Sequence, residues 1–286
     1  MGALWMLAAG FLFGCMGVFV KLGAAHFSSS ELVFYRSLFG LLLVYVMLRK
    51  RSLSFATPHA MGHVWRGLSG SAAMILFFYC ISVLPLATAI TLNYTSSLFL
   101  TLLTILLFKD RFHLPLTVAL AVGFSGVVLL LRPTLDHNQL LPGLLGLCSG
   151  LFAGVALLNV RQLGRQGEPA SRIVFYFNLI ATVVSGLWML HTPLHAPTPG
   201  NLPLLIAIGT CATLAQLAMT RAYRLGQTLS VSTLSYSTIA FASLFGMLLW
   251  HEMLPLSGWL GILLIVTSGV LSLKLAPKHT EPANIK

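Results

Sequence analysis

The sequence predicts an all-α integral membrane protein, with ten transmembrane helices in two inverted five-helix repeats around a central cavity. Three observations lead to this prediction: a low charge content, ten long apolar segments, and a strong sorting of basic residues between alternate loops. Charged residues make up 8% of the 286 residues, whereas soluble domains contain about 25%. A soluble chain of this length could not cover its surface with so few charges.

Ten apolar segments follow one another with short connections, and each is long enough to cross a hydrocarbon core of about 30 Å. They use most of the chain and leave no room for a soluble domain. We expect transmembrane helices at about Leu4–Ala25, Leu32–Leu48, Val64–Val83, Leu86–Phe108, Leu114–Leu131, Gly143–Val160, Ile173–Leu190, Leu204–Tyr223, Thr228–Trp250 and Leu256–Leu273.

The basic residues predict the orientation of the chain. If the N-terminus and the even-numbered loops share one side, that side holds 14 of the 17 Lys and Arg residues, and the other side holds only Lys21, Arg36 and Arg132. Short loops rich in Lys and Arg face the cytoplasm, so we expect a multi-pass inner-membrane protein with both termini inside. The net charge of +11 then reflects helix ends beside anionic lipid. Nucleic acid is not expected as a partner, because no basic run is interleaved with stacking aromatics.

The chain resembles itself when it is shifted by about 140 residues, which predicts an internal repeat. Tyr94 falls on Tyr236 at an offset of 142. The remaining matches are Asp110 with Glu252, Val33-Phe34-Tyr35 with Val174-Phe175-Tyr176, and Gly10 and Gly14 with Gly150 and Gly154. Each match is weak alone, but they occur in order and the offset drifts slowly.

Each repeat contains an odd number of crossings, so the second repeat starts from the opposite side of the membrane and is an inverted copy of the first. Inverted repeats are typical of secondary transporters, whose substrate site lies near the midplane between the halves. The predicted organisation is a first repeat at 1–135, a linker at 136–142, a second repeat at 143–274 and a cytoplasmic tail at 275–286.

Several short motifs resemble those of the drug/metabolite transporter superfamily, specifically bacterial EamA-type permeases. The motifs are Phe34-Tyr35-Arg36, Leu84-Pro85-Leu86-Ala87 and Lys109-Asp110-Arg111-Phe112, the last echoed by His251-Glu252-Met253-Leu254. The resemblance covers essentially the whole chain. It implies a ten-helix inverted-repeat fold with a central cavity and transport of amino acids, nucleotide-linked sugars, metabolites or drugs, without naming the cargo.

Arg36 is the most informative single residue. It lies about 6 Å inside the outer end of the second segment, where a guanidinium usually faces the protein interior or a water-filled cavity. Its planar fork suits a carboxylate or phosphate of a substrate. The structural alternative is that Arg36 reaches the interface or pairs with Glu31.

A polar stripe on the fourth segment and a related one on the ninth predict a cavity wall. Asn93, Ser97, Thr101 and Thr104 share one helical face, and their counterparts are Ser232, Ser235 and Ser243. Helix packing and hydroxyl bonds to the preceding turn are the alternative reading. The full set of predicted substrate-binding or cavity residues is Arg36, Tyr35, Tyr79, Asn93, Tyr94, Ser97, Tyr176, Asn178, Gln216, Ser235 and Tyr236.

All six acidic residues and all nine histidines lie in loops or near segment ends. We therefore predict no catalytic residues, no metal site, no cofactor and no carboxylate proton relay. Asp110 and Glu252 are expected to hold helix ends next to Arg111 and His251.

The sequence thus predicts a non-enzymatic secondary transporter that moves a small organic solute, such as an amino acid, an organic anion or related metabolite, or a drug, by alternating access. The alternatives are a membrane-embedded receptor or scaffold without transport and an intramembrane enzyme. The expected partners are the solute and the lipid bilayer. The cargo, the direction, the oligomeric state and the energy source (facilitator, exchanger or proton-coupled) stay open.

Overall fold

The computed structural model describes residues 2–50, 54–108, 114–136, 139–190, 194–225 and 234–275. Within these ranges the chain is helical and contains no strand, which confirms the predicted all-helical class. The helices are α1 (Gly2–Gly23), α2 (Ser29–Lys50), α3 (Ala60–Val83), α4 (Leu86–Tyr94), α5 (Ser96–Phe108), α6 (Leu114–Asp136), α7 (Leu140–Arg165), α8 (Ala170–Met189), α9 (Leu202–Leu225), α11 (Ser237–Trp250) and α12 (Leu256–Leu275).

Each predicted apolar segment is mostly helical over the residues that the structure describes. Six stretches are long and apolar enough to cross a membrane in one piece: α1, α2, α3, α7, α8 and, in α9, Leu202–Met219. Shorter apolar helical stretches are Ala121–Leu130 in α6, α11, and Leu256–Leu271 in α12. The protein is therefore a multi-pass membrane protein, although the described ranges alone do not supply ten full-length spans.

Prolines help to set where the helices begin. Pro85 and Pro169 directly precede α4 and α8 as their N-cap residues. Pro115, Pro142 and Pro203 lie in the first turns of α6, α7 and α9. Proline suits these positions because the first turn of a helix has no intrahelical partner for its N–H groups and needs the backbone angle that the ring imposes.

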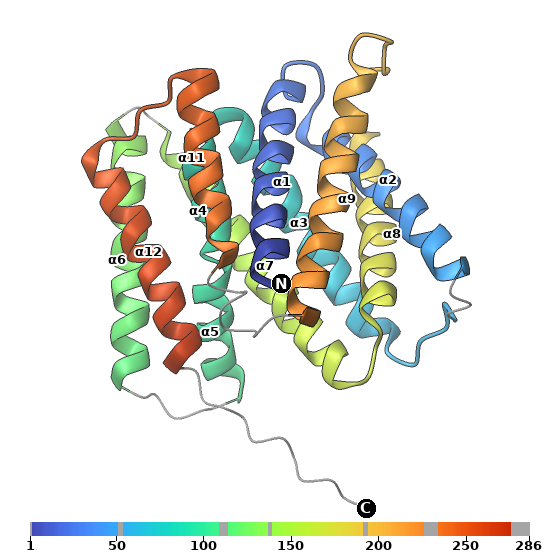
Figure 1. The fold of residues 1–286 in the computed structure, drawn as a ribbon, viewed down its shortest axis with the longest axis horizontal. Coiled ribbons are helices and arrows are strands. Elements are labelled where there is room, and N and C mark those ends of the chain that lie inside the picture. The colour runs from blue at the N-terminus through green and yellow to red at the C-terminus, as the bar shows by residue number, and fades with distance from the viewer. Residues whose placement is uncertain are drawn as a thin grey trace, which may run out of the picture.

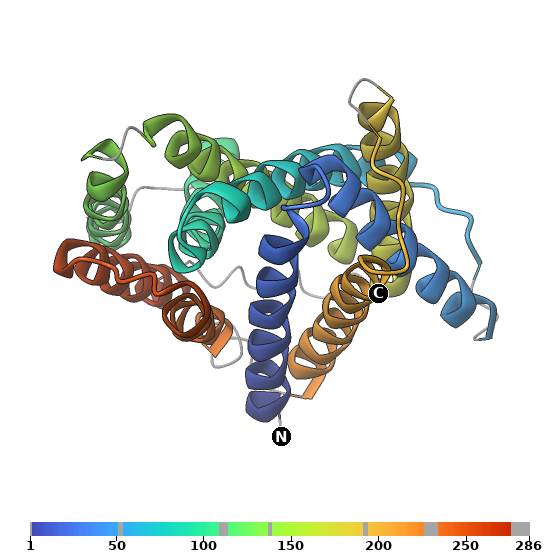
Figure 2. The ribbon, with the colours of Figure 1, turned by 90° about the horizontal axis from the view of Figure 1, so that it is seen from above.

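The helices pack in pairs, and each main pair joins one helix from each half of the chain. α6 packs on α12, α1 on α9, α3 on α7 and α2 on α8. The α6–α12 pair stands apart at the left of both Figure 1 and Figure 2, while α2, α8 and α9 form the opposite side. The two halves therefore interleave, and the contact between them runs through the whole molecule.

Glycines allow the closest of these approaches. A side chain at Gly126 would lie 2.8 Å from the Gly261 carbonyl oxygen, and one at Gly261 would lie 2.7 Å from the Gly126 carbonyl oxygen. The backbones of α6 and α12 thus touch at this crossing. Small residues at such crossings are the usual means of packing helices in a bilayer, where no hydrophobic driving force between helices exists.

The fourth predicted segment is divided into α4 and α5 at Thr95, although no proline lies there. Thr95 keeps helical backbone angles, and its hydroxyl donates to the Leu92 carbonyl at 2.6 Å. The ninth segment has a corresponding irregularity at Tyr236, immediately before α11. Both irregularities lie where the two segments face each other, since α4 packs on α11.

Candidate functional site

Arg36 lies inside the protein. Its residue surface is 8% exposed, and its guanidinium faces the Met74 sulfur at 3.3 Å and the Gln216 side-chain oxygen at 3.5 Å. Glu31, the alternative partner considered from the sequence, instead accepts from the backbone N–H groups of Ser28 and His195. The side chain of Arg36 therefore extends from α2 toward α3 and α9.

Arg66 corrects a prediction. The charge count placed Arg66 at a cytoplasmic helix end, but its Nε and Nη1 atoms are buried and have no hydrogen-bond partner within the described ranges. The guanidinium folds along α3 toward Gly70, where any side chain would collide with Nη1. The charge count fails here because it registers only where the Cα lies, whereas the arginine stem spans more than one helical turn.

The two arginines share one aromatic ring. Phe177 on α8 has the Cζ atom of Arg66 4.2 Å from its ring centroid and that of Arg36 at 6.0 Å. Because both distances are measured from the same ring centroid, the two guanidinium carbons are at most about 10 Å apart. Phe177 is buried and lies in the middle part of α8. We call Arg36, Arg66, Phe177 and Gln216 the arginine site.

A second group of predicted residues meets where α4 and α5 face α11. Tyr94 and Tyr236 have ring centroids 5.8 Å apart. The Tyr94 hydroxyl donates to the Thr238 hydroxyl at 2.9 Å, and the Tyr236 and Ser97 hydroxyls are hydrogen-bonded at 2.6 Å. Each tyrosine therefore bonds to a hydroxyl that lies two or three residues after the other. We call this group the tyrosine pair.

The remaining predicted residues are dispersed. Asn93 donates to the Ser149 hydroxyl on α7 at 3.3 Å. Asn178 is buried against Gly40 on α2. Tyr35 packs beside Phe27 and Phe34, Tyr79 packs against the hydrophobic core, and the Ser235 carbonyl accepts from Thr238.

The polar stripes are only partly visible. Ser97 bonds across to Tyr236, whereas the Ser243 hydroxyl donates to the Ile239 carbonyl one turn earlier, as the packing alternative expected. The side chains of Thr101 and Thr104, and Ser232 as a whole, lie outside the described residues.

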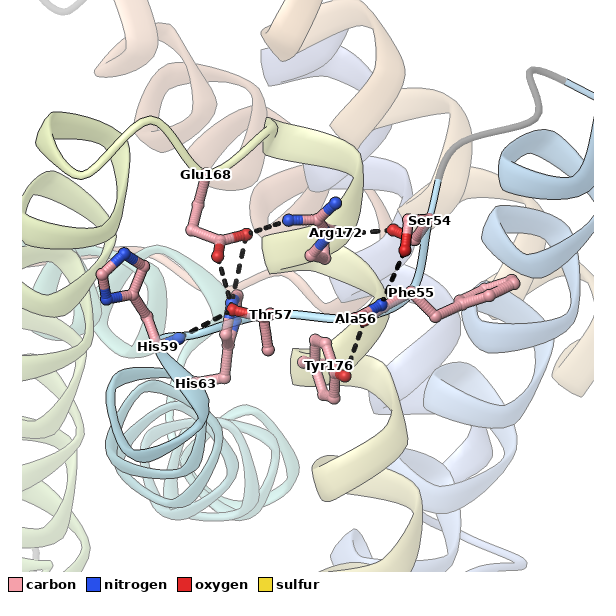
Figure 3. Close-up of polar contacts among 9 residues, drawn as sticks. All are labelled: Ser54, Phe55, Ala56, Thr57, His59, His63, Glu168, Arg172 and Tyr176. Carbon is pink, nitrogen blue, oxygen red and sulfur yellow. Dashed lines mark hydrogen bonds and ion pairs between the residues drawn. The ribbon is translucent and has the colours of Figure 1, made fainter.

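Tyr176, the neighbour of Phe177 in α8, bonds to the segment before α3. Its hydroxyl donates to the Phe55 carbonyl at 2.8 Å, in the segment between α2 and α3, and its ring lies 4.6 Å from that of His63 (Figure 3). This contact was not predicted from the sequence, because Phe55 is distant from Tyr176 in the chain and accepts the bond through its backbone carbonyl.

Glu168 is the centre of this inner-end group, which we call the Glu168 cluster. It accepts from the Thr57 hydroxyl and from Arg172 Nη1 at 2.9 Å, and His63 Nε2 lies 3.5 Å away (Figure 3). Arg172 also donates to the Ser54 carbonyl at 3.0 Å. Burial favours the neutral carboxyl, but the hydrogen bonds from Thr57 and Arg172 and the nearby positive charge outweigh burial and hold the pKa of Glu168 below its ordinary value.

The opposite ends of the helices are held by two other acids. Glu252 binds Lys21 and accepts from the backbone N–H of Leu86 at 2.7 Å, so it joins the end of α1 to the start of α4. The sequence had predicted a role beside His251, which instead adopts a left-handed conformation that ends α11. Glu31 bonds to His195 through both backbone and side chain.

The acids with described side chains are thus all engaged away from the arginine site. Glu31, Glu168 and Glu252 each bind a basic partner or backbone N–H groups elsewhere. Asp110 and Glu281 lie outside the described residues, as does the side chain of Asp136. Across the part of the chain that the structure describes, no group of three or more His, Cys, Asp or Glu side chains could hold a metal ion.

A cleft of about 250 Å³ opens beside the Glu168 cluster, between α3 and α7. It is lined by Pro58, His59, Met61, Gly62, Asn159, Gln162, Leu163 and Gln166. None of the predicted cavity residues lines this cleft.

Sequence reasoning missed four residues that the structure places beside the predicted ones: Arg66, Phe177, Thr238 and Ser149. A signal existed for two of them. Arg66 is the seventh residue of α3 and is followed by Gly70 one turn later, and Phe177 falls on Arg36 at the offset of 141 that aligns Val33-Phe34-Tyr35 with Val174-Phe175-Tyr176.

Comparison with known proteins identifies the family. The EamA-like transporter family matches residues 1–132 and 141–274. An uncharacterized transporter of Helicobacter pylori strain J99 is 31% identical over 278 residues, covering 94% of this chain and 93% of that protein. The pseudopaline exporter CntI of Pseudomonas aeruginosa PAO1 is 30% identical over 274 residues and 95% of both chains.

More distant proteins agree. A riboflavin transporter of Vibrio cholerae is 26% identical over 273 residues, covering 93% of this chain and 91% of that protein. A solved crystal structure with 18% identity superposes with a TM-score of 0.67 over 96% of this chain and 98% of the other, which supports the fold. The family match spans nearly the whole chain, and the named relatives are transporters. The chain therefore belongs to the EamA-like transporter family.

Proposed function

We propose that this protein is a secondary transporter that moves a small organic solute across the inner membrane by alternating access. The observation that carries this proposal is the position of the arginine site. Arg36 and Arg66 come from α2 and α3 of the first half, and Phe177 and Gln216 come from α8 and α9 of the second half. Transporters built from repeats bind their substrates at such an interface.

An inverted-repeat arrangement is supported by reciprocal contacts. A side chain at Gly10 on α1 would meet Ser237 and Thr238, while one at Gly150 on α7 would meet Thr95 and Ser96. Likewise, Gly126 meets Gly261 while the Ser268 hydroxyl donates to the Ala119 carbonyl. In each contact, one residue belongs to the first half and the other to the second half. Adding about 142 to the first residue number and subtracting about 142 from the second gives nearly the residues of the counterpart contact, as a pseudo-two-fold axis requires.

Ten crossings with both termini in the cytoplasm follow from the distribution of the basic residues. In support, α1 begins and α12 ends toward the lower side of the molecule in Figure 1. The proposed units are 1–135 and 143–274, joined by 136–142 and followed by the tail 275–286. A C-terminal alkaline phosphatase fusion is expected to be inactive and a C-terminal fluorescent fusion bright, and the reverse would contradict this topology.

Alternating access needs contacts that close each end in turn. The Glu168 cluster is suited to close the inner end, because it ties the segment before α3 to the start of α8. The pair of Lys21 and Glu252 and the pair of Glu31 and His195 are suited to close the outer end. In this proposal the end clusters open alternately, while the solute binds between the halves.

The energy source we propose is facilitated or exchange transport. Glu31, Glu168 and Glu252 lie at helix ends, which leaves the described interior without a carboxylate to relay protons. Uptake into vesicles with an imposed pH gradient tests this point. Strong gradient-driven accumulation that is lost on neutralising Glu31 or Glu252 would contradict it.

The cargo is proposed only as a small organic solute. Relatives are named for pseudopaline and for riboflavin, which gives two organic compounds with which to begin. A receptor or scaffold without transport, or an intramembrane enzyme, has less support because the named relatives are transporters.

The experiment is a flux assay with the purified protein in liposomes, using pseudopaline, riboflavin, amino acids and organic anions as cargo. The proposal expects saturable flux of at least one solute above protein-free liposomes. Stabilisation by a ligand without any flux across the panel would instead favour a receptor.

A further inference from the structure

We infer that Arg36 and Arg66 together form an anion-binding site that holds a carboxylate or phosphate group of the cargo. This inference rests on the proposed function, since it names the chemical class of solute that the interface between the halves takes. Nothing in the family comparison assigns a role to Arg66.

The positive charges of the arginine site are not balanced by any described acid. Two guanidiniums lie over one buried ring, and no described acid lies beside either of them. Each of Glu31, Glu168 and Glu252 is bound to other partners at the helix ends. Burying a charge without a partner is strongly unfavourable, and burying two of the same sign in one place is more so. A bound anion removes this penalty.

Arg66 has unused hydrogen-bonding capacity within the described ranges. A guanidinium has five N–H donors, and Nε and Nη1 of Arg66 are buried without a partner. Arg36 donates to a weak acceptor, the Met74 sulfur at 3.3 Å, and makes a long contact with the Gln216 side-chain oxygen at 3.5 Å. Carboxylate and phosphate oxygens are the acceptors that match a guanidinium fork, often through two parallel bonds.

The fold makes room for the Arg66 guanidinium. A side chain at Gly70 would collide with Nη1 of Arg66 and come within 2.8 Å of the Phe177 ring. Gly70 thus lets the arginine extend along α3 toward the middle of the membrane instead of toward the nearer surface. An arginine that only set the membrane orientation of the chain would not need this space, because a long basic side chain near a helix end can extend to the membrane interface.

Each arginine lies near the start of its own helix, and in the proposed topology the two reach the site from opposite sides of the membrane. Arg36 lies about 10 Å along α2 from Ser29, and Arg66 lies about 9 Å along α3 from Ala60. In the proposed topology these starts are on opposite sides of the membrane. An anion between the guanidiniums would therefore be reached from the outside past Arg36 and from the inside past Arg66.

The test is binding of defined anions to the detergent-purified full-length protein. Citrate and inorganic phosphate are the probes. Uncharged tricarballylamide at equal concentration is the matched neutral compound. The readouts are the thermal midpoint of unfolding and a direct binding titration. The wild type is expected to be stabilised by at least one of the anions and not by the neutral compound, because a ligand that binds the folded state raises its stability.

Three variants locate the effect. Arg66→Met should weaken anion binding by about ten-fold or more, the loss expected for one charge-assisted hydrogen bond. Gly70→Ala keeps every charge but displaces the guanidinium, so it should weaken binding in the same direction. Arg49→Met removes an equal charge from an exposed position at the end of α2 and should bind as the wild type does.

The inference is overturned if neither anion stabilises the wild type beyond the neutral compound, or if Arg49→Met weakens binding as much as Arg66→Met. The binding test needs no transport, so it separates this inference from the proposed function. Flux without anion binding would keep the transporter and reject the site, and anion binding without flux of any solute would do the reverse.

Discussion

The Glu168 cluster and the arginine site are both built around buried charge, yet their charge balance is opposite. Glu168 is surrounded by Arg172, Thr57 and His63, so its negative charge is compensated within the protein. Arg36 and Arg66 share the face of Phe177 and have no described acid beside them. The first arrangement is complete without a ligand. In our proposal, the second is completed by an anionic group of the cargo.

The difference also follows the fold. The Glu168 cluster ties the segment at residues 54–59 to the start of α8, where water is near and an ion pair adds order to a loop (Figure 3). The arginine site lies between helices of the two halves, where backbone groups are already satisfied within the helices. The two guanidiniums are not needed to satisfy that backbone, and this is why we assign them to the cargo.

The largest expected effect on stability is at Glu168. Its side chain is 2% exposed, and Glu168→Gln leaves the positive charge of Arg172 without its partner. We expect the free energy of unfolding to fall by about 3 kcal/mol, the usual result of breaking a buried pair from one side. Chemical denaturation in detergent measures the change. A loss no greater than that of Arg49→Met, which removes an exposed charge at the end of α2, would show that the cluster does not hold the inner end.

A large effect on transport, with little effect on stability, is expected at Arg36. Arg36→Lys keeps the charge but replaces the planar fork with a point charge, which cannot make two parallel bonds to one carboxylate. Flux of an anionic or zwitterionic solute should fall about ten-fold while the thermal midpoint stays near that of the wild type. Normal flux by a well-folded Lys variant would return Arg36 to a structural role.

Acidification should act on the Glu168 cluster before it acts on the arginine site. The pKa of Glu168 is held below its ordinary value of 4.5. The contribution of Glu168 to stability is therefore complete above pH 4.5 and is lost as the pH falls through the lower, folded-state pKa. Arginine does not titrate in this range. At neutral pH the wild type should be more stable than Glu168→Gln. The difference between the two stability–pH curves should shrink under acid, where the two curves should converge.

A smaller effect is expected at the tyrosine pair. Tyr236→Phe removes the hydroxyl that bonds to Ser97 at 2.6 Å, and Tyr94→Phe removes the one that bonds to Thr238 at 2.9 Å. Each should lower the free energy of unfolding by about 1 kcal/mol, the usual net value of such a bond. Because the two contacts are near counterparts in the two halves, the two variants should differ little, which denaturation curves can test.

Sequence patterns predicted the helices well because membrane helices are read from length and hydropathy, which are local. Every predicted segment, from Leu4–Ala25 to Leu256–Leu273, is mostly helical where it is described. The division of the fourth segment at Thr95 was not predicted. It coincides with the contact of α4 with α11 and with a bond from the Thr95 hydroxyl to the Leu92 carbonyl, and neither of these involves a proline.

The site was predicted less completely, and the reason is side-chain reach. Arg36 was identified because its Cα lies well inside a segment, but Arg66 was assigned to a helix end because its Cα lies nearer one. Only the packing of Phe177 and Gly70 shows that the Arg66 guanidinium turns inward. The contact of Tyr176 was also not predicted, because the backbone carbonyl of Phe55 accepts the bond and a side-chain pattern does not show this.

The most direct test of the contrast between the two groups compares Arg66→Met and Glu168→Gln by thermal unfolding in the same detergent, in a buffer free of carboxylates and phosphate. We predict opposite signs. Removing the uncompensated charge of Arg66 should leave the midpoint unchanged or raise it, because an apolar side chain of similar length replaces an unpaired buried charge, whereas removing the charge of Glu168 should lower it. A midpoint that falls equally in both variants would mean that Arg66 has a structural partner of its own, and the assignment of the arginine site to an anionic cargo would be wrong.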